Sequence, residues 1–494
     1  MSDAPYEIII GLEVHVQLKT ETKLFCGCPN RFGAEPNTQT CPVCIGLPGA
    51  LPVMNRRAFQ LALKTAIALN CRIPDFTKWD RKQYYYPDLP KGYQISQFDL
   101  PLSEQGFLAI SDAQGAFPDK PIRITRAHLE EDAGKSMHDE LAGRADSRID
   151  LNRAGTPLLE IVSEPDMRSP QEARAYLSEL KLLLTYLDVS DCNMQEGSLR
   201  VDANVNLQLD SPRGRVATPI VEVKNMNSFR AVERALAYEV QRQYQVWCDS
   251  GVARGDSGGH KTTRGWDEQA QVTRAQRQKE ESSDYRYFPD PDLAPVTVRP
   301  EQIEAVRQEM GELPAALRDR LQSVYELAAS DAEVIVNQGP AFADYFEKLA
   351  ELSGDSRRAS NWMQQDVLRT LNEQNQTIAD FPIPATALAE LLKTLETGSL
   401  ESSRARDVFQ TMVESGSNVA AARQQLGIET VDQSELLDLC GQLLDENPAI
   451  VADVLAGKAK AVGALIGQAK RRNPNANPNQ VRQLCLQLIE QRKP

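Results

Sequence analysis

The sequence predicts an α+β protein in which a sheet-rich N-terminal region precedes a helical C-terminal region. Up to residue 296, short runs that alternate apolar and polar residues are separated by Gly, Pro and Asn, a pattern typical of antiparallel strands joined by loops. Beyond residue 296, apolar residues recur three and four positions apart, which indicates amphipathic helices. The 494 residues, 41% of them apolar and 25% charged, are enough for two to four globular domains.

The strands are clearest in three segments of the N-terminal region, which are residues 6–16, 200–209 and 219–223. Because successive side chains of a strand point to opposite faces, each segment directs its apolar residues to one face and its polar residues to the other. We therefore expect residues 1–296 to form a domain built on an antiparallel sheet, with the polar face available for chemistry.

The helices beyond residue 296 are predicted from the spacing of their apolar residues. The pattern is clearest in three sets: Ile303, Val306 and Met310; Leu317, Leu321 and Val324; and Leu388, Leu391, Leu392 and Leu395. Ser330 and Glu333 have the spacing of a capping box at a helix start. The Ser-rich residues 399–403 then divide a helical domain, residues 297–400, from a small all-helical tail, residues 401–494.

The charge of the chain limits its partners. A formal net charge of −14 argues against a general nucleic-acid binder, since non-specific affinity comes mostly from Lys and Arg. The tail is a local exception, although such clusters are more often solvated helix faces; its basic residues are Lys458, Lys460, Lys470, Arg471, Arg472, Arg482, Arg492 and Lys493. No run reaches the roughly 18 apolar residues of a membrane span and no signal-peptide pattern begins the chain, which favours a cytoplasmic protein.

Four of the nine cysteines are clustered, and they predict a zinc site. Cys26 and Cys28 form a Cys-x-Cys pair, and Cys41 and Cys44 form a Cys-x-x-Cys pair that follows after twelve intervening residues. Four thiolates complete a tetrahedron around Zn²⁺ and leave no open position, so a zinc knuckle over residues 26–44 is expected to be structural. Unligated thiols are the alternative, and the five remaining cysteines are expected to lie in the core.

A second metal chemistry is predicted from the acidic residues. Glu13 and His15 are two positions apart on a predicted strand, so both side chains lie on one face. Glu160 lies within an apolar strand, where an unpaired carboxylate costs several kcal/mol. Residues 130–132 add three carboxylates, for which a solvated face is an equal alternative. Carboxylate oxygens favour Mg²⁺, which shares its ligands with substrate phosphates, so phosphoryl chemistry is indicated.

Two further motifs are weaker. Residues 255–259, Gly-Asp-Ser-Gly-Gly, match the loop around the nucleophile of trypsin-like proteases, but their surroundings favour a surface loop. Gly134, Lys135 and Ser136 resemble the end of a phosphate-binding P-loop, but the glycine that this loop needs five positions earlier is Leu129. Neither motif therefore predicts a function.

Several segments together resemble one family, the B subunits of aspartyl/glutamyl-tRNA amidotransferases, from residue 6 to the end of the chain. The resemblance is carried by residues 11–15, the cysteine cluster, and residues 84–97, 128–135, 151–157 and 284–292. It implies a cradle-shaped N-terminal domain, a helical domain and a tail like the YqeY domain that binds tRNA. The activity that it implies is ATP-dependent: the side-chain carboxylate of Glu-tRNA(Gln) or Asp-tRNA(Asn) is phosphorylated, and ammonia displaces the phosphate.

The resemblance also implies roles for individual residues. Glu13, His15, Glu130 and Glu160 are expected to bind the catalytic Mg²⁺ beside ATP, with Glu131 as the alternative to Glu130. The residues expected to bind phosphates or the tRNA terminus are Lys82, Tyr86, Lys91, Lys135, Arg153, Arg200 and Lys224. Neutral hydrogen-bonding partners, each equally compatible with an ordinary turn or strand residue, are Asn204, Asn206, Asn225 and Asn227.

The resemblance further implies a heterotrimer. The chain carries no amidase signature, so ammonia is expected from a separate amidase (glutaminase) subunit, joined through a small third subunit and connected by a tunnel. The alternative is a non-catalytic, zinc-bearing scaffold that binds tRNA. The two hypotheses differ in ATP consumption, which only a ligase would show with misacylated tRNA.

Overall fold

The computed structural model describes residues 6–112, 115–138, 147–276, 285–397, 399–428, 433–456, 458–473 and 475–492. The predicted motif residue Asp284 and the predicted tail cation Lys493 lie outside this set. The chain divides into two compact units, Met1–Ala316 and Leu317–Pro494. Sheet elements dominate the first unit and helices form the second, so the predicted α+β class is confirmed.

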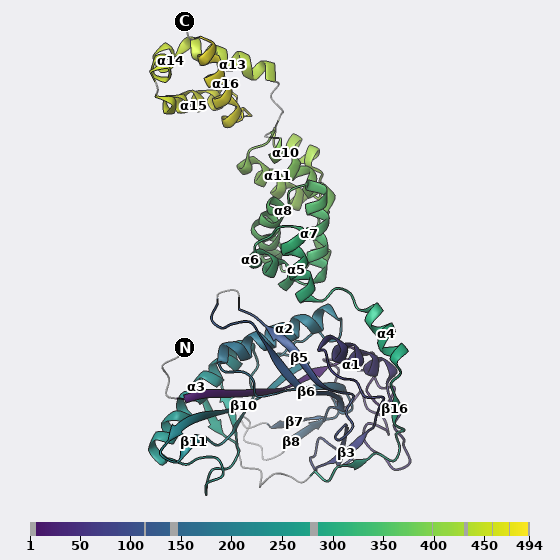
Figure 1. Ribbon diagram of the computed structural model, residues 1–494. Helices are drawn as coiled ribbons and strands as arrows, with labels where there is room; N and C mark the ends of the chain where they lie inside the picture. The colour runs from purple at the N-terminus through teal and green to yellow at the C-terminus, as the bar shows by residue number, and fades with distance from the viewer. Residues whose placement is uncertain are drawn as a thin grey trace. The chain divides into compact units, whose positions relative to one another are not determined.

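The first unit is organised around a nine-stranded sheet (Figure 1). Across the sheet the strands are β14 (Val272–Ala275), β13 (Thr262–Asp267), β12 (Val221–Lys224), β10 (Leu199–Ser211), β1 (Tyr6–Gln17), β9 (Pro157–Ser163), β6 (Lys120–Glu131) and β5 (Ser103–Ile110), with β11 (Gly214–Ala217) paired to β10. The three predicted strands are confirmed as β1, β10 and β12.

One strand pair departs from the predicted antiparallel sheet. Strands β12 and β13 run parallel, whereas the other pairs of this sheet are antiparallel. The physical reason is the connection between them: helix α3 (Phe229–Ser250) carries the chain back along the sheet, as a parallel pair requires. The predicted antiparallel pairing therefore holds for the other strand pairs of this sheet but not for this one.

The central strand β1 separates the two faces of the sheet. Ile10, Leu12, Val14 and Val16 are at most 1% exposed and lie in the core, while the intervening residues point to the opposite face. Helices α2 (Pro170–Tyr186) and α3 contribute their apolar stripes to the same core. The sheet therefore has one face covered by helices and one face that carries polar side chains.

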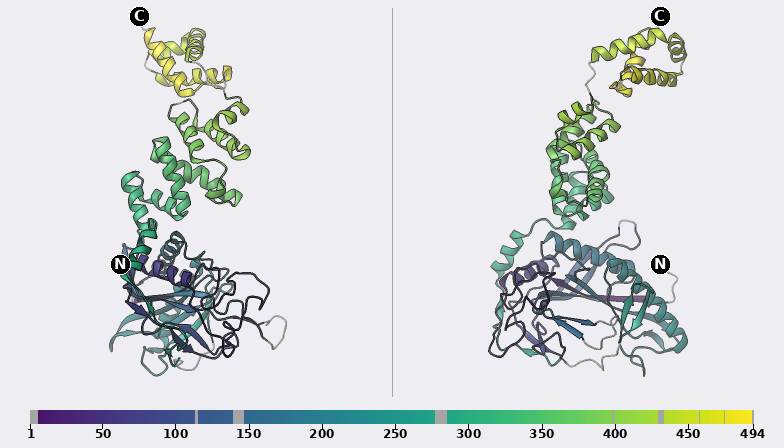
Figure 2. Two further views of the ribbon diagram at one scale, coloured as in Figure 1. Left: turned by 90° about the vertical axis from the view of Figure 1, so that its right-hand side faces the viewer. Right: turned by 180° about the vertical axis from the view of Figure 1, so that it is seen from behind.

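Smaller elements complete the first unit. Helix α1 (Arg56–Ala68) contacts helix α4 (Pro300–Glu309), whose predicted apolar stripe packs against the core of this unit. The short strands are β2 (Phe76–Thr77) with β16 (Val296–Thr297), β3 (Asp80–Gln83) with β4 (Tyr93–Ser96) and β15 (Phe288–Pro289), and β7 (Lys135–His138) with β8 (Ser147–Asp150). In Figures 1 and 2, α2 lies on one side of the large sheet, and β7 and β8 lie on the other.

The second unit is helical. Its helices are α5 (Pro314–Val324), which begins at the end of the first unit, α6 (Ala329–Asn337), α7 (Pro340–Ser353), α8 (Ser356–Trp362), α9 (Leu368–Gln374), α10 (Ala385–Glu396), α11 (Ser402–Ser415), α12 (Val419–Gln425), α13 (Gln433–Glu446), α14 (Pro448–Leu455), α15 (Val462–Arg472) and α16 (Pro478–Gln491), with short turns at Met363–Val367, Ile378–Asp380 and Ala459–Ala461. Helices α5 and α10 match the predicted stripes. The predicted domain boundaries at 296 and 400 stay a prediction.

Two predictions for this unit need correction. Helix α6 begins at Ala329 after Ala328, which makes no side-chain capping bond, so Ser330 lies inside the first turn and no capping box forms. The basic tail cluster is also partly neutralised. Helix α13 packs against α15 and α16 and places acidic residues next to cations that are distant in the sequence. Arg472 pairs with Glu446, and Arg492 pairs with Asp445.

None of the helices in the described ranges combines the length and the apolar character needed to cross a membrane.

The core between α3 and the sheet gives a stability prediction. Leu236 is fully buried on α3, so Leu236→Ala leaves a cavity and should lower the free energy of unfolding by about 2–5 kcal/mol. Val246 lies on the same helix but is 46% exposed, so Val246→Ala should change the free energy of unfolding by less than about 0.5 kcal/mol. Urea unfolding followed by tryptophan fluorescence measures both. Equal effects of the two substitutions would contradict the assigned core face.

Candidate active site

The polar face of the sheet aligns four polar side chains in one row. Strand pairing places His15 of β1 directly opposite Arg200 of β10 on one side and Glu160 of β9 on the other. Glu160 in turn lies opposite His128 of β6. Since directly opposed residues of neighbouring strands share a face, the register alone brings together residues that are far apart in the sequence.

Glu130 joins this row from the same strand as His128, two positions further along. The Nε2 atom of His15 lies 3.5 Å from Glu130 Oε1 and 3.8 Å from Glu160 Oε2. One ligand atom from each of the three side chains lies within 4.8 Å of the other two. His128 Nε2 lies 3.3 Å from Glu160 Oε2, on the side away from His15. The three side chains are therefore close enough to share one metal ion.

Burial makes this cluster electrostatically costly. The side chain of Glu130 is 3% exposed, and its burial, together with the neighbouring charge of Glu160, raises its pKa to about 8. Burial acts in the same direction on Glu160, but His128, His15 and Lys82 together outweigh it and lower the pKa of that carboxyl. Burial also lowers the pKa of His15, which keeps its imidazole neutral and able to bind a metal.

The donor set fits a divalent cation. Glu130 Oε2 is buried and has no hydrogen-bond partner among the described residues, although buried carboxylate oxygens are normally satisfied. Two carboxylates and one neutral imidazole would supply hard oxygen ligands and one nitrogen ligand to the ion. A cation at this position would satisfy the free oxygen and offset the repulsion between Glu130 and Glu160.

Glu13 lies on the same face but is held differently. It lies two residues before His15, opposite Asp202 of β10, and accepts a hydrogen bond of 2.9 Å from Asn204 Nδ2. Burial, followed by the charge of Glu160, raises its pKa. In the described part of the chain, Glu13 is not one of the residues whose ligand atoms converge with that of His15.

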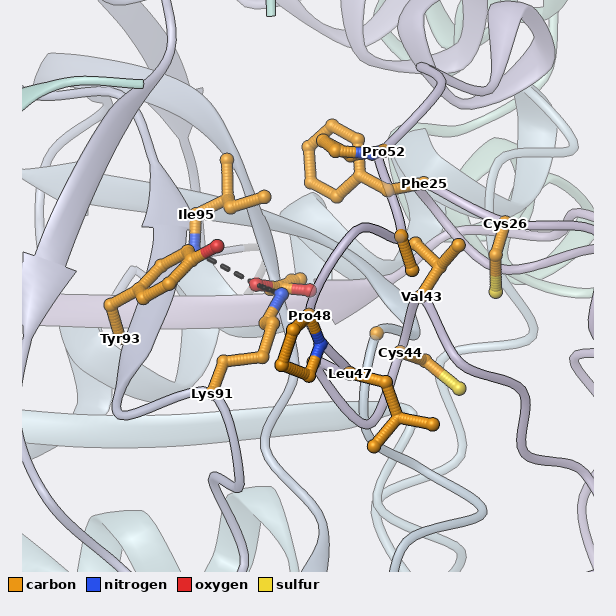
Figure 3. A pocket seen from close by; sticks show the side chains of 14 residues that line it. Phe25, Cys26, Val43, Cys44, Leu47, Pro48, Pro52, Lys91, Tyr93 and Ile95 are labelled. Atoms are coloured by element: carbon orange, nitrogen blue, oxygen red, sulfur yellow. Dashed lines mark hydrogen bonds and ion pairs between the residues drawn. The ribbon is translucent and has the colours of Figure 1, made fainter. Parts of the chain in front are cut away.

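The structure separates Glu131 from Glu130. Strand alternation turns Glu131 away from His15, and its carboxylate pairs with Lys91 and accepts the backbone N–H of Ile95 at 2.9 Å. These groups line a cavity of about 190 Å³ beside the cysteine cluster (Figure 3). Glu130, Glu131 and Asp132 are at most 5% exposed, so the alternative of a solvated acidic face was wrong.

Three of the predicted phosphate-binding cations lie beside these carboxylates. Lys82 of β3 lies 5.0 Å above the Tyr285 ring, and although burial opposes its charge, Glu130 raises its pKa. Arg200 donates to Asp132 at 2.7 Å, and Arg153 lies 3.3 Å from the same carboxylate. These groups give the polar face cations as well as carboxylates.

The remaining predicted residues lie farther from the three converging ligands. Lys224 pairs with Asp202 on the sheet, whereas Lys135 is exposed at the start of β7 and Tyr86 is 43% exposed in the loop after β3. Asn206 is buried on β10, and Asn225 and Asn227 are exposed after β12.

The four clustered cysteines converge as predicted. One sulfur from each of Cys26, Cys28, Cys41 and Cys44 lies within 4.8 Å of the others, and Cys28 and Cys44 are buried. Hydrogen bonding from Cys26 lowers the pKa of Cys44 to about 4, which favours its thiolate form. The set fits the four-thiolate chemistry of a structural zinc ion.

The sequence analysis gave no role to three polar residues beside these sites, although His128 and Asp132 belong to the acidic stretch that it singled out. His128 precedes Glu130 by two positions, so strand alternation was a usable signal. Asp132 binds both Arg153 and Arg200, a connection that depends on three separate segments. Lys23 is fully buried beside the cysteine cluster, and its sequence neighbours give no indication of that burial.

Comparison with known proteins identifies the family. Residues 8–304 match the GatB/GatE catalytic domain, and residues 344–489 match the GatB domain. Proteins named as the B subunit of aspartyl/glutamyl-tRNA(Asn/Gln) amidotransferase are similar along nearly the whole chain. The protein of Rhodopirellula baltica is 61% identical over 98% of this chain and 97% of its own length. That of Moorella thermoacetica is 48% identical over 98% of this chain and its full length.

The matches cover both compact units, and the first domain match contains His15, Glu130 and Glu160 as well as the four clustered cysteines. The chain belongs to the family of aspartyl/glutamyl-tRNA(Asn/Gln) amidotransferase B subunits.

Proposed function

We propose that this chain is the ATP-dependent ligase component of a tRNA amidotransferase, with the polar face of the sheet as its active site. The observation that supports this most strongly is the convergence of His15, Glu130 and Glu160, with one oxygen of Glu130 that no described residue hydrogen-bonds. Buried carboxylates that lack enough cationic partners fit a site that binds Mg²⁺ together with a phosphate-bearing substrate. We infer the amide-transfer reaction from the names of the related proteins.

The proposed reaction has two steps. A side-chain carboxylate oxygen of Glu-tRNA(Gln) or Asp-tRNA(Asn) attacks the γ-phosphorus of ATP, and the bond from that phosphorus to ADP breaks. Ammonia then attacks the acyl carbon, phosphate leaves, and the nitrogen releases a proton to give Gln-tRNA(Gln) or Asn-tRNA(Asn). A carboxylate is a poor electrophile, so the phosphate is needed as a leaving group.

In this reaction some side chains would bind the metal ion, and others would orient the phosphates or the tRNA terminus. Bound Mg²⁺ would neutralise charge on the phosphates, with His15, Glu130 and Glu160 as its ligands and Glu13 close by on the same strand. Lys82, Arg153 and Arg200 would orient phosphates or the tRNA terminus, because phosphoryl transfer depends mostly on positioning and charge neutralisation. Lys91 pairs with Glu131, which leaves Glu130 as our proposed ligand of the two.

Partners and a structural metal complete the proposal. We place a structural zinc ion on Cys26, Cys28, Cys41 and Cys44, and tRNA contacts on the helical tail. Ammonia would come through a tunnel from an amidase (glutaminase) subunit held by a small third subunit. Because aminoacylated tRNA is used in translation, we assign the complex to the cytoplasm.

Removal of one proposed metal ligand should weaken cation binding. Glu130→Gln removes a charge from the converging set, so the affinity for Mg²⁺, or for Mn²⁺ as a spectroscopic probe, should fall at least about tenfold. The control is Glu164→Gln, which alters a carboxylate that follows β9 and binds Thr125. Titration calorimetry, or electron paramagnetic resonance with Mn²⁺, measures both. Unchanged binding in Glu130→Gln would exclude this residue as a ligand.

The catalytic proposal is tested with ammonium chloride as the nitrogen donor. The wild-type complex should form amide on Glu-tRNA(Gln) or Asp-tRNA(Asn) only with ATP. Glu160→Gln should retain tRNA binding and lose about 100-fold or more in rate, because it removes a proposed metal ligand. Glu164→Gln should keep the wild-type rate. If the wild-type complex forms no amide and consumes no ATP, the non-catalytic tRNA-binding scaffold becomes the better account.

The tail proposal is tested by the salt dependence of tRNA binding. Arg471 and Arg482 are exposed on α15 and α16, so their joint replacement by Ala should weaken binding and reduce the slope of log K against log salt by about 1 for each lost phosphate contact. The control is Arg492→Ala, which should lower the tRNA affinity and the salt slope less, because Arg492 is paired with Asp445. An unchanged slope in the double variant would place the tRNA contacts elsewhere.

A further inference from the structure

A lysine that the proposed reaction does not use is completely buried beside the cysteine cluster. Lys23 is 0% exposed, and it precedes the first cluster residue, Cys26, by three positions. Lysine is almost never fully buried unless its ammonium is paired, because removal of that charge from water costs several kcal/mol. Its surroundings must therefore supply both hydrogen-bond acceptors and a compensating negative charge.

The three hydrogen-bond donors of this ammonium each have an acceptor. Lys23 Nζ donates to the carbonyl oxygen of Gln39 at 2.7 Å, to that of Leu151 at 3.4 Å and to Cys44 Sγ at 3.7 Å. A lysine ammonium has three donors and no acceptor, so its hydrogen-bonding capacity is complete. The two carbonyl groups are neutral, which leaves the sulfur of Cys44 as the only one of these three acceptors that can carry a charge.

The charge of Lys23 is not compensated in the usual way, by a carboxylate. Among the described residues, no Asp or Glu forms an ion pair with its ammonium. Glu131 borders the same glycine, Gly155, but its carboxylate is paired with Lys91. The buried positive charge therefore has the cysteine cluster as its neighbouring source of negative charge.

The cysteine cluster has the complementary need. Four thiolates around one Zn²⁺ ion leave two negative charges uncompensated, in a site where Cys28 and Cys44 are buried. Groups that donate hydrogen bonds to metal ligands orient those ligands and tune the affinity for the metal. The backbone N–H of Cys41 and the ammonium of Lys23 both point at Cys44 Sγ, and only the ammonium brings a full charge.

We propose that Lys23 is the counter-ion of the zinc site, a positioning residue that stabilises the thiolate of Cys44 and so retards the release of zinc. The proposal rests on the zinc ion assigned under the proposed function. It adds a residue outside the four ligands whose charge slows the loss of the metal.

The same side chain also joins the knuckle to the polar face of the sheet. Leu151 lies in the segment that continues to Gly155, whose carbonyl oxygen accepts a hydrogen bond from the backbone N–H of Leu24. A Cβ atom added to Gly155 would lie 3.6 Å from Cδ of Lys23. This is an ordinary contact distance, so the positive φ of 86° is what explains the glycine. Gly155 then donates to the backbone oxygen of Asp132, the partner of Arg200.

Two substitutions separate the charge of Lys23 from its hydrogen bonds. Lys23→Met removes both, whereas Lys23→Gln removes the charge but keeps an amide that can donate to the carbonyl groups. Lys19→Met is the matched control, because Lys19 lies four residues earlier, is 64% exposed and pairs with Asp188. The purified chains are analysed for zinc content, for the rate of zinc transfer to a chromogenic chelator, and for the sulfur-to-cobalt charge-transfer band after cobalt replacement.

The proposal predicts that both Lys23 variants release zinc about 10- to 100-fold faster than the wild type and Lys19→Met. It also predicts that their cobalt band shifts to longer wavelength, because the sulfur loses a charged donor. Fast release in Lys23→Met with wild-type release and an unshifted band in Lys23→Gln would overturn it, since Lys23 would then only hold the main chain.

Wild-type release in both variants would also overturn the proposal. If Lys23→Met does not yield folded protein by circular dichroism, Lys23→Gln alone decides. A wild-type chain that neither contains nor takes up zinc would overturn the zinc assignment itself, together with this inference. Because no amide formation is measured, the outcome is independent of the ligase test.

Discussion

The register of strand β1 is the constraint on which the rest of the structure depends. It is paired on both sides, with β9 and β10, and its apolar residues are fixed in the core beneath α2 and α3. A slip by one residue would move Glu13 and His15 into that core, so burial of the apolar face also fixes the functional face. Hydrophobic packing fixes the register of β1, and this register brings His15 next to Glu160, which lies beside His128.

Compensation of buried charge is the second principle of this molecule. Glu131 has Lys91, Asp132 has Arg153 and Arg200, and Glu160 has His128. Glu130 has one free oxygen, and Lys23 has no carboxylate partner within the described ranges. These two exceptions lie at the proposed magnesium site and at the proposed zinc site. Each proposal supplies the missing charge, a cation for Glu130 and a thiolate cluster for Lys23.

The predictions that needed correction share a physical cause. The parallel pair of β12 and β13 follows from the return path of α3, and the neutralised tail cations follow from the packing of α13 against α15 and α16. The missing capping box reflects a helix that starts one residue earlier than its Ser. In each case the local pattern predicted the right kind of feature: a strand, a charge cluster or a helix. What the local pattern did not predict was the direction of the strand, the partners of the charges or the first residue of the helix, because these depend on distant segments or on the path of the backbone.

The sequence by itself determined the α+β class, the four-cysteine knuckle, the shared face of Glu13 and His15, and the family, because these depend on local periodicity, ligand spacing and motifs. Only the tertiary structure decided that Glu130, rather than Glu131, meets His15 and Glu160. It also revealed His128 beside Glu160, Asp132 between two arginines, and the burial of Lys23. These contacts join strands and loops that are up to about 145 residues apart, and strand register and packing, which no local pattern encodes, bring them together.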